Sequence, residues 1–186
     1  MGILRAMKHS EYIYTYDDIL TPEECCEYIA LTEAIGYEAA PITAGRGFAM
    51  RPDIRNNTRV ILNDKSRART LWERVTDLVP QHLSDRRVVG LNERFRFYRY
   101  DPGECFALHR DGAFERRNGE KSLLTFMVYL NDGFEGGTTT FGDVEIVPAT
   151  GMALVFHHFL LHEGSAVRQG RKYVLRSDVM YSPPGT

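Results

Sequence analysis

Cysteine is scarce in this sequence of 186 residues, which contains Cys25, Cys26 and Cys105 and no other. An odd count that includes an adjacent pair argues against a disulfide framework. The C-x-x-C spacing of many zinc sites is also absent from the sequence. We therefore expect reduced thiols in a cytoplasmic protein, with at least one of the adjacent pair packed as a small core residue.

Long hydrophobic runs and a strong charge of one sign are also missing. No apolar run approaches the roughly 18–20 residues that cross a bilayer, and the apolar stretch in MGILRAMKHSEY is too short for a secretory signal. The 23 basic and 25 acidic side chains give a net charge of −2, which offers no argument for a nucleic-acid or membrane partner. Two clusters of arginines stand out in the sequence, and a solvated face is the default interpretation of both, with a local basic patch as the alternative. The clusters are Arg51, Arg55 and Arg59, and Arg110, Arg116 and Arg117. The oligomeric state stays open.

Two helices are indicated in the first half of the chain. In TPEECCEYIALTEAIG, Thr21 is a natural N-cap, Glu24 completes a capping box and Gly36 provides a stop. A second helix is predicted over about 64–79 from apolar residues at i, i+3 and i+4 spacing, and Pro80 ends it. Both helices are expected to support the fold and to carry no chemistry.

Short strands dominate after about residue 90, separated by turn signals such as DPG, NDG, EGG and ATG. Many closely spaced short strands favour a sandwich or barrel. The sequence therefore predicts a mainly β fold with supporting helices, an α+β protein. The expected strands are 94–100, 123–130, 138–141, 144–147, 152–156 and 172–181.

The stretch CFALHRDGAF places His109 and Asp111 two positions apart at the end of an expected strand. An imidazole and a carboxylate at this spacing could bind a metal together with a third ligand from a later strand. The chain offers His157, His158 and His162 in MALVFHHFLLHEG. Two histidines and one carboxylate form the facial triad of non-haem Fe(II) oxygenases, although H-x-D alone is a weak signal.

Three longer stretches strengthen that signal: YRYDPGECFALHRD, TFMVYLNDGFEGGTTTF and PATGMALVFHHFLLHEGSAVRQGRKYVL. From residue 98 to the end, the chain resembles the 2-oxoglutarate-dependent Fe(II) oxygenases, and within them the prolyl 4-hydroxylase-like group. The resemblance implies a double-stranded β-helix, the jelly-roll or cupin-like core. It implies one dioxygenase domain over residues 1–186, with helical support and substrate-side segments in 1–90 and the catalytic core in 91–181.

The resemblance also implies the metal ligands, with Fe(II) as the cofactor. It assigns His109, Asp111 and His162 as the iron-binding and catalytic residues. His162 is selected because it begins HEG and lies ten residues before Lys172, as the family pattern requires. We expect structural or site-lining roles for the other two histidines of the HHFLLH segment.

A cationic anchor for the distal carboxylate of 2-oxoglutarate is implied as well. The family pattern favours Lys172, but Arg176 shares its strand face and is the alternative. One of the two could instead pair with Asp178, which has the same parity. The resemblance further places Tyr129 and Tyr100 near the cosubstrate, whereas a buried core tyrosine is the alternative for both. Thr139 is expected to shape the turn and strand.

The implied reaction is hydroxylation of a substrate C–H bond with 2-oxoglutarate and O₂, releasing succinate and CO₂, with ascorbate as a possible reductant. A prolyl residue in a peptide or protein is the first expectation for the substrate. The alternatives are a free amino acid or other small molecule, and a cupin-like metal-binding module without oxygenase activity. Residues 44–59 and 113–121 are candidate lips of the site, with plain surface loops as the other interpretation.

Overall fold

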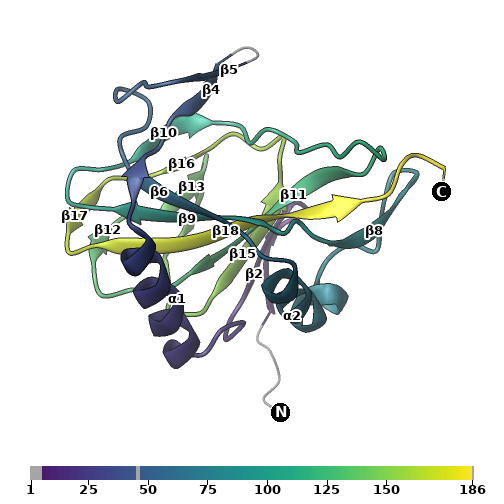
Figure 1. The fold of residues 1–186 in the computed structure, drawn as a ribbon, viewed down its shortest axis with the longest axis horizontal. Coiled ribbons are helices and arrows are strands. Elements are labelled where there is room, and N and C mark those ends of the chain that lie inside the picture. Colours follow the sequence, from purple (N-terminus) through teal and green to yellow (C-terminus); the bar gives the residue numbers. More distant parts are fainter. Residues whose placement is uncertain (1–5, 45–46, 186) are drawn as a thin grey trace.

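The computed structural model describes residues 6–44 and 47–185, and most of its regular structure is antiparallel β-sheet (Figure 1). The strand order in the main sheet is β1-β2-β15-β11-β18-β9-β6-β3, and β8 pairs with the end of β18 and with β7. The mainly β fold is confirmed. The strands of this sheet are β1 (Ala6–Ser10), β2 (Ile13–Tyr16), β3 (Glu38–Ala39), β6 (Thr58–Asn63), β7 (His82–Leu83), β8 (Arg86–Leu91), β9 (Arg94–Tyr100), β11 (Lys121–Tyr129), β15 (Ala153–His157) and β18 (Lys172–Tyr181).

A smaller sheet with the order β10-β16-β13-β14 lies against one face of the main sheet. Phe141 and Ile146 of the small sheet pack with Tyr98, Phe156 and Val174 of the main sheet in one buried cluster. Two short pairs, β12 with β17 and β4 with β5, complete the fold. The bounds are β4 (Ile42–Ala44), β5 (Gly47–Ala49), β10 (Phe106–His109), β12 (Glu135–Gly136), β13 (Thr139–Phe141), β14 (Val144–Ile146), β16 (His162–Gly164) and β17 (Val167–Gln169).

Two α-helices cover the other face of the main sheet (Figure 1). They are α1 (Pro22–Ile35) and α2 (Lys65–Val75), and α2 continues into the 3-10 helix η1 (Thr76–Leu78). The predicted capping box of Thr21 with Glu24 is present. Neither helix in the described part of the chain has the length and apolar character needed to cross a bilayer.

Strand β9 illustrates how the alternation of its side chains separates the helical face from the inner face. Phe95 and Phe97 are fully buried under the helices, and the Phe97 ring lies 5.6 Å from the Tyr28 ring of α1. Arg96, Tyr98 and Tyr100 have the opposite parity, and the two tyrosines belong to the cluster between the sheets. Arg96, Tyr98 and Tyr100 therefore share the face that lines the interior.

The N-terminal half contributes more than helical support. Strands β1, β2, β3, β6 and β8 all join the main sheet, and β6 pairs with β9 over six residues. The sequence-based prediction missed them because several are short or lie at an edge, where a strand without a buried face has no apolar alternation. Strand β1, for example, has no buried residue.

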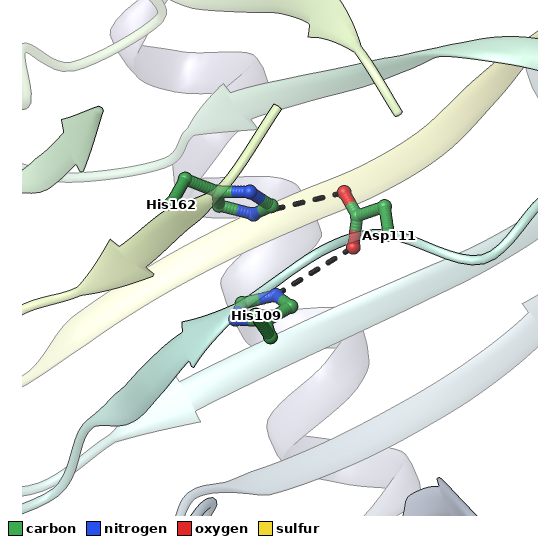
Figure 2. Close-up of side chains that lie close together, drawn as sticks. All are labelled: His109, Asp111 and His162. Carbon is green, nitrogen blue, oxygen red and sulfur yellow. Dashed lines mark ion pairs between the residues drawn. The ribbon is translucent and has the colours of Figure 1, made fainter. Parts of the chain in front are cut away.

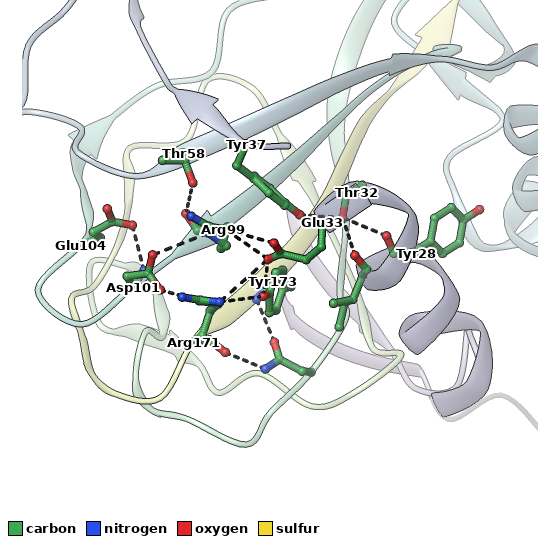
Figure 3. Close-up of polar contacts among 12 residues, drawn as sticks. Tyr28, Thr32, Glu33, Tyr37, Thr58, Arg99, Asp101, Glu104, Arg171 and Tyr173 are labelled. Atoms are coloured by element: carbon green, nitrogen blue, oxygen red, sulfur yellow. Dashed lines mark hydrogen bonds and ion pairs between the residues drawn. The ribbon is translucent and has the colours of Figure 1, made fainter. Parts of the chain in front are cut away.

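A polar network fixes α1 to the outer face of β9 and β18 (Figure 3). The Glu33 carboxylate of α1 accepts hydrogen bonds from the Tyr173 hydroxyl at 2.6 Å and from Arg99 at 3.2 Å. Arg171 donates to Asp101 at 2.5 Å. These contacts hold the outer side chains of two neighbouring strands, whose inward-facing neighbours, including Lys172, line the interior of the fold.

Candidate active site

Three side chains converge at one end of the paired strands β10 and β16 of the small sheet. His109 ends β10, Asp111 follows in the next loop, and His162 begins β16, which pairs with β10 so that the two histidines are opposite each other. One potential ligand atom from each residue lies within 4.8 Å of the others. Figure 2 shows the Asp111 carboxylate facing both rings, at 3.6 Å from His109 Nε2 and 3.7 Å from His162 Nε2.

Backbone carbonyls orient both imidazoles. Nδ1 of His109 lies 2.8 Å from the Ala107 carbonyl oxygen, and Nδ1 of His162 lies 3.1 Å from the Leu160 carbonyl oxygen. Because a carbonyl only accepts, each ring carries a proton on Nδ1, and its Nε2 is directed toward Asp111. Burial lowers the pKa of His162 to about 4, which favours the neutral, ligating form.

The carboxylate of Asp111 is held in its ionised form. Burial alone would raise its pKa, but the Arg176 guanidinium, 3.1 Å away, and hydrogen bonding outweigh burial and hold the pKa well below the usual value. Two neutral imidazole nitrogens and one carboxylate oxygen are the donor set of a 2-His-1-carboxylate metal centre.

A chain of hydrogen bonds orients the Asp111 carboxylate. The Thr125 hydroxyl donates to Asp111 Oδ2 at 2.5 Å, so its oxygen accepts from His158 Nδ1 at 3.0 Å. His158 is neutral because burial lowers its pKa to about 4, and its Nε2 therefore accepts from the Ser122 hydroxyl at 2.9 Å. Ser122 in turn accepts from the Phe114 amide at 2.8 Å. Every member of the chain has a consistent donor and acceptor role.

A narrow cavity of about 40 Å³ extends from the triad to Lys172. Lys172 is buried, and its Nζ donates to the Gly137 carbonyl at 2.5 Å and lies 5.2 and 5.3 Å from the ring centroids of Tyr100 and Tyr129. Burial alone lowers its pKa, to about 7, and no carboxylate of the described residues pairs with it. A buried cation without a counter-charge is a site for an anion.

Tyr100 and Tyr129 differ in their access to this cavity. Tyr100 lines it, whereas Tyr129 is fully buried behind its wall and shares a 2.7 Å hydrogen bond with Thr139. Thr139 itself lines the cavity, a position that the strand pattern did not reveal. Its hydroxyl can therefore face a ligand while Tyr129 supports it from behind.

Arg176, the other candidate anchor, already has two acidic partners. It pairs with Asp111 at 3.1 Å and with Asp178 at 3.4 Å. Arg176 lies four residues beyond Lys172 in β18, on the same face of the strand. It is the closer of the two to the triad, because it pairs with Asp111. Of the two cations, Lys172 is the one that has no acid partner in the described part of the chain.

A wider cleft of about 590 Å³ opens on the other side of His109 and Asp111. Both candidate lips contribute to its wall: Ile54 and Arg55 from the first, and Ala113 with Phe114 from the second. Arg55 forms a β-bridge with Phe106, which ties the first segment to β10. Residues 45–46 of this segment are outside the described residues.

The remaining histidines of the HHFLLH segment do not reach the triad. His158 is the buried link described above, and His157 makes ring contacts with Tyr12 at 5.0 Å and Phe159 at 5.3 Å. The role of His158 depends on three segments meeting in space, so the sequence carries no local signal for it.

Comparison with known proteins agrees with this geometry. Residues 95–177 match the family model of the 2OG-Fe(II) oxygenase superfamily. Prolyl 4-hydroxylase 1 of Arabidopsis thaliana is 24% identical over 192 residues, covering 88% of this chain and 67% of the relative. A relative from Acanthamoeba polyphaga mimivirus, named as a prolyl 4-hydroxylase, is 31% identical over 103 residues, covering 44% of this chain and 42% of the relative. The chain thus spans less than half the length of some curated relatives.

Solved structures show the same fold. The viral collagen prolyl hydroxylase of Paramecium bursaria Chlorella virus-1, in its 2-oxoglutarate complex, has a TM-score of 0.66 and 21% identity, covering 93% of this chain and 97% of that one. A Trichoplax adhaerens prolyl hydroxylase bound to a hypoxia inducible factor peptide has a TM-score of 0.69 and 16% identity, covering 91% and 84%. This chain therefore shares the fold of these prolyl hydroxylases, and its residues 95–177 are similar to the 2OG-Fe(II) oxygenase superfamily.

Proposed function

We propose that this chain is a 2-oxoglutarate- and O₂-dependent Fe(II) dioxygenase that hydroxylates a substrate C–H bond. The observation that carries the proposal is the cluster of two imidazoles and one carboxylate next to a buried lysine that has no acid partner among the described residues. His109, Asp111 and His162 would hold the metal, a donor set that suits Fe(II) and leaves coordination positions free. When bound, Fe(II) with 2-oxoglutarate supplies the oxidative chemistry, with succinate and CO₂ as by-products.

The protein's own groups position these components. Lys172 would exchange its hydrogen bond to the Gly137 carbonyl for the distal carboxylate of 2-oxoglutarate, a charge-assisted contact in a buried setting. Tyr100 lines this cavity and Thr139, backed by Tyr129, offers a further hydroxyl. Arg176 would hold Asp111 in its ionised form and is the second candidate for cosubstrate contact.

We propose a prolyl residue in a peptide or protein as the substrate. Two observations support this choice: the curated relatives are named as prolyl 4-hydroxylases, and a structural neighbour has a peptide bound. The cleft of about 590 Å³ beside His109 and Asp111 is large enough for several residues of an extended chain.

The setting of the enzyme follows from other features. We propose that residues 1–186 act as one oxygenase domain, because strands of the N-terminal half pair within the same main sheet as the core. The three cysteines are all free thiols, which favours the reducing cytoplasm. Ascorbate is the proposed reductant that keeps the iron ferrous.

The test is turnover with Fe(II), 2-oxoglutarate and a library of proline-containing peptides and metabolites. We expect succinate to form together with a mass gain of one oxygen atom in a peptide. His109→Ala should abolish both signals, whereas His157→Ala, a histidine outside the cluster, should retain them. Full turnover in His109→Ala would refute the assignment of the metal ligands.

A further inference from the structure

The wide cleft next to the triad has an unusual charge balance. Six arginines line it, and Asp111 is the one carboxylate among its described lining residues. The arginines come from three strands, β6, β9 and β18, and two loops, so a single basic segment does not explain them. We call this the arginine cleft, and its arginines are Arg55, Arg59, Arg94, Arg96, Arg110 and Arg176.

Acidic residues of the protein neutralise a minority of these charges. Arg96 pairs with the buried Asp178 at 3.0 Å, and Arg176 pairs with Asp111 and Asp178. The other four arginines have no ion pair with any carboxylate of the described residues, and Arg110 donates to the Phe159 carbonyl instead. The cleft therefore keeps a surplus of positive charge.

Arg55 is the clearest sign that this surplus is built for a ligand. Its side chain is 5% exposed, and the guanidinium carbon lies 4.3 Å from the Tyr98 ring centroid and 4.5 Å from that of Phe106. Nε donates to Asn57 at 2.7 Å, but Nη2 is buried without a hydrogen-bond partner. Phe106 also stacks on His109 at 3.5 Å, so the unpartnered group is fixed one ring away from the triad. A buried N–H without a partner is costly unless a ligand satisfies it.

Cross-strand pairing concentrates the charge further. Arg96 of β9 is directly opposite Arg176 of β18, and Arg59 of β6 is directly opposite Tyr98. Asp178 bridges the two opposed arginines, whereas Arg59 has no acidic partner among the described residues. Burial and the neighbouring arginines, including Arg55, lower the pKa of Arg59, and the same positive field overcomes burial to lower the pKa of Tyr98 to about 8. The positive field of the cleft therefore reaches the titratable groups of its own wall.

The cosubstrate does not account for this field. Its proposed anchor, Lys172, lies in the narrow cavity on the other side of the triad. Of the six arginines, Arg176 alone lines both spaces. The solvated-face explanation suits the exposed Arg110 but not the buried Arg55.

We propose that the arginine cleft binds a carboxylate of the substrate, placing an acidic group next to the carbon to be hydroxylated. This inference rests on the proposed hydroxylase function and names the class of its substrate. The carboxylate belongs either to an Asp or Glu side chain beside the target proline or to the α-carboxylate of the target residue itself. Arg55, Arg59 and Arg94 recognise it through guanidinium N–H groups that have no acid partner among residues 6–44 and 47–185.

The first test compares affinities of acid and amide pairs for the full chain. One pair is two labelled peptides that differ in Glu or Gln next to a central proline, and the other is N-acetylproline and N-acetylprolinamide as competitors. We expect the acid of at least one pair to bind about tenfold or more tightly than its amide, the effect of one charge-assisted contact. The pair that shows the preference identifies the source of the carboxylate.

Variants connect this preference to the cleft. Arg59→Gln and Arg94→Gln should each reduce the acid preference, and the double variant should remove it. Arg69→Gln, on the exposed face of α2, should retain it. Equal binding of acid and amide in both pairs, or a preference that survives the double variant, would overturn the inference.

Turnover of the same peptides separates this inference from the proposed function. Hydroxylation without an acid preference would reject the carboxylate site and leave the hydroxylase standing. An acid preference that depends on Arg59 and Arg94, without succinate formation on any peptide, would support the binding site and count against the prolyl hydroxylase.

Discussion

At the scale of single residues, two cations on one face of β18 have opposite surroundings. Lys172 is buried beside two tyrosine rings without an acid partner, and Arg176 is paired with Asp111 and Asp178. An incoming carboxylate gains a full counter-charge at the lysine but must compete with two acids at the arginine. This difference makes the choice of anchor testable.

Replacing Lys172 with methionine should weaken 2-oxoglutarate binding about 10- to 100-fold, the range of one lost charge-assisted hydrogen bond. Arg176→Met should weaken it less and should also disturb Asp111, its ion-pair partner. Titration with 2-oxoglutarate measures both. The opposite order of the two effects would transfer the anchor to Arg176.

The pKa of Lys172, lowered to about 7 by burial, predicts a pH dependence. The protonated ammonium is the form that binds a carboxylate, so affinity is full below pH 7 and falls as the free protein loses this proton above pH 7. The dissociation constant of 2-oxoglutarate should rise by up to about tenfold per pH unit above 7. Lys172→Arg stays charged and should flatten the profile. A wild-type affinity that is constant from neutral to alkaline pH would contradict this.

Thr125 should affect metal binding although it is not one of the proposed ligands, because its hydroxyl holds the ligand Asp111. Thr125→Val keeps the shape of the side chain but removes the hydrogen bond to Asp111 and leaves His158 Nδ1 without its acceptor. Metal affinity should fall about 10- to 100-fold, as is usual for a lost partner of a ligand. The measurement is a metal titration of this variant beside Thr138→Val. Thr138 donates to Ser165 and does not belong to the hydrogen bonds that lead to Asp111. Equal affinities would dismiss the positioning role.

At this scale, the sequence could predict residues whose spacing is local. His109 and Asp111 are two positions apart, and His162 stands at a fixed distance before Lys172. The role of Thr125 escaped prediction, and Arg55 was named only in a candidate basic patch, because both roles arise when segments far apart in the chain meet. Neither residue differs locally from any other threonine in a strand or arginine in a loop.

At the scale of elements, turns with left-handed backbone hold the strands in place. Gly151, before β15, has φ of +79°, and a Cβ there would lie 2.1 Å from the Leu20 carbonyl oxygen. Its own carbonyl accepts hydrogen bonds from the amides of Ile19 and Leu20. This turn therefore joins the N-terminal segment to the strand that leads to the HHFLLH histidines.

Gly151→Ala should reduce the free energy of unfolding by about 2–4 kcal/mol, since both backbone strain and the contact with Leu20 oppose a side chain. Gly142→Ala is the matched control: its φ of +59° is also left-handed, but nothing lies within 4 Å of an added Cβ. The control should lose only about 1 kcal/mol. Denaturant unfolding of the two variants measures the difference, and equal losses would show that packing at Gly151 contributes little.

Elements with complete local signals were predictable and the others were not. The capping box at Thr21 and Glu24 predicted the start of α1, and the strand expected over 94–100 is β9. Edge strands such as β1 lack buried residues, and β3 has only two residues. Their existence depends on pairing partners that a single stretch of sequence does not contain.

At the scale of the whole molecule, two compartments border one candidate metal site. The narrow cavity extends to Lys172, and the arginine cleft opens on the other side, so His109, Asp111 and Arg176 border both. A dicarboxylate and a larger substrate can therefore approach the same point from different directions. The central claim of this arrangement is that His109, Asp111 and His162 bind one ferrous ion.

Iron content under anaerobic conditions tests that claim most directly. The wild-type chain should bind about one equivalent of Fe(II), and His109→Ala and His162→Ala should each lose most of it because two ligands do not form a stable site. His157→Ala should retain the wild-type content. Full iron binding in both His109→Ala and His162→Ala, with the fold intact, would contradict the account.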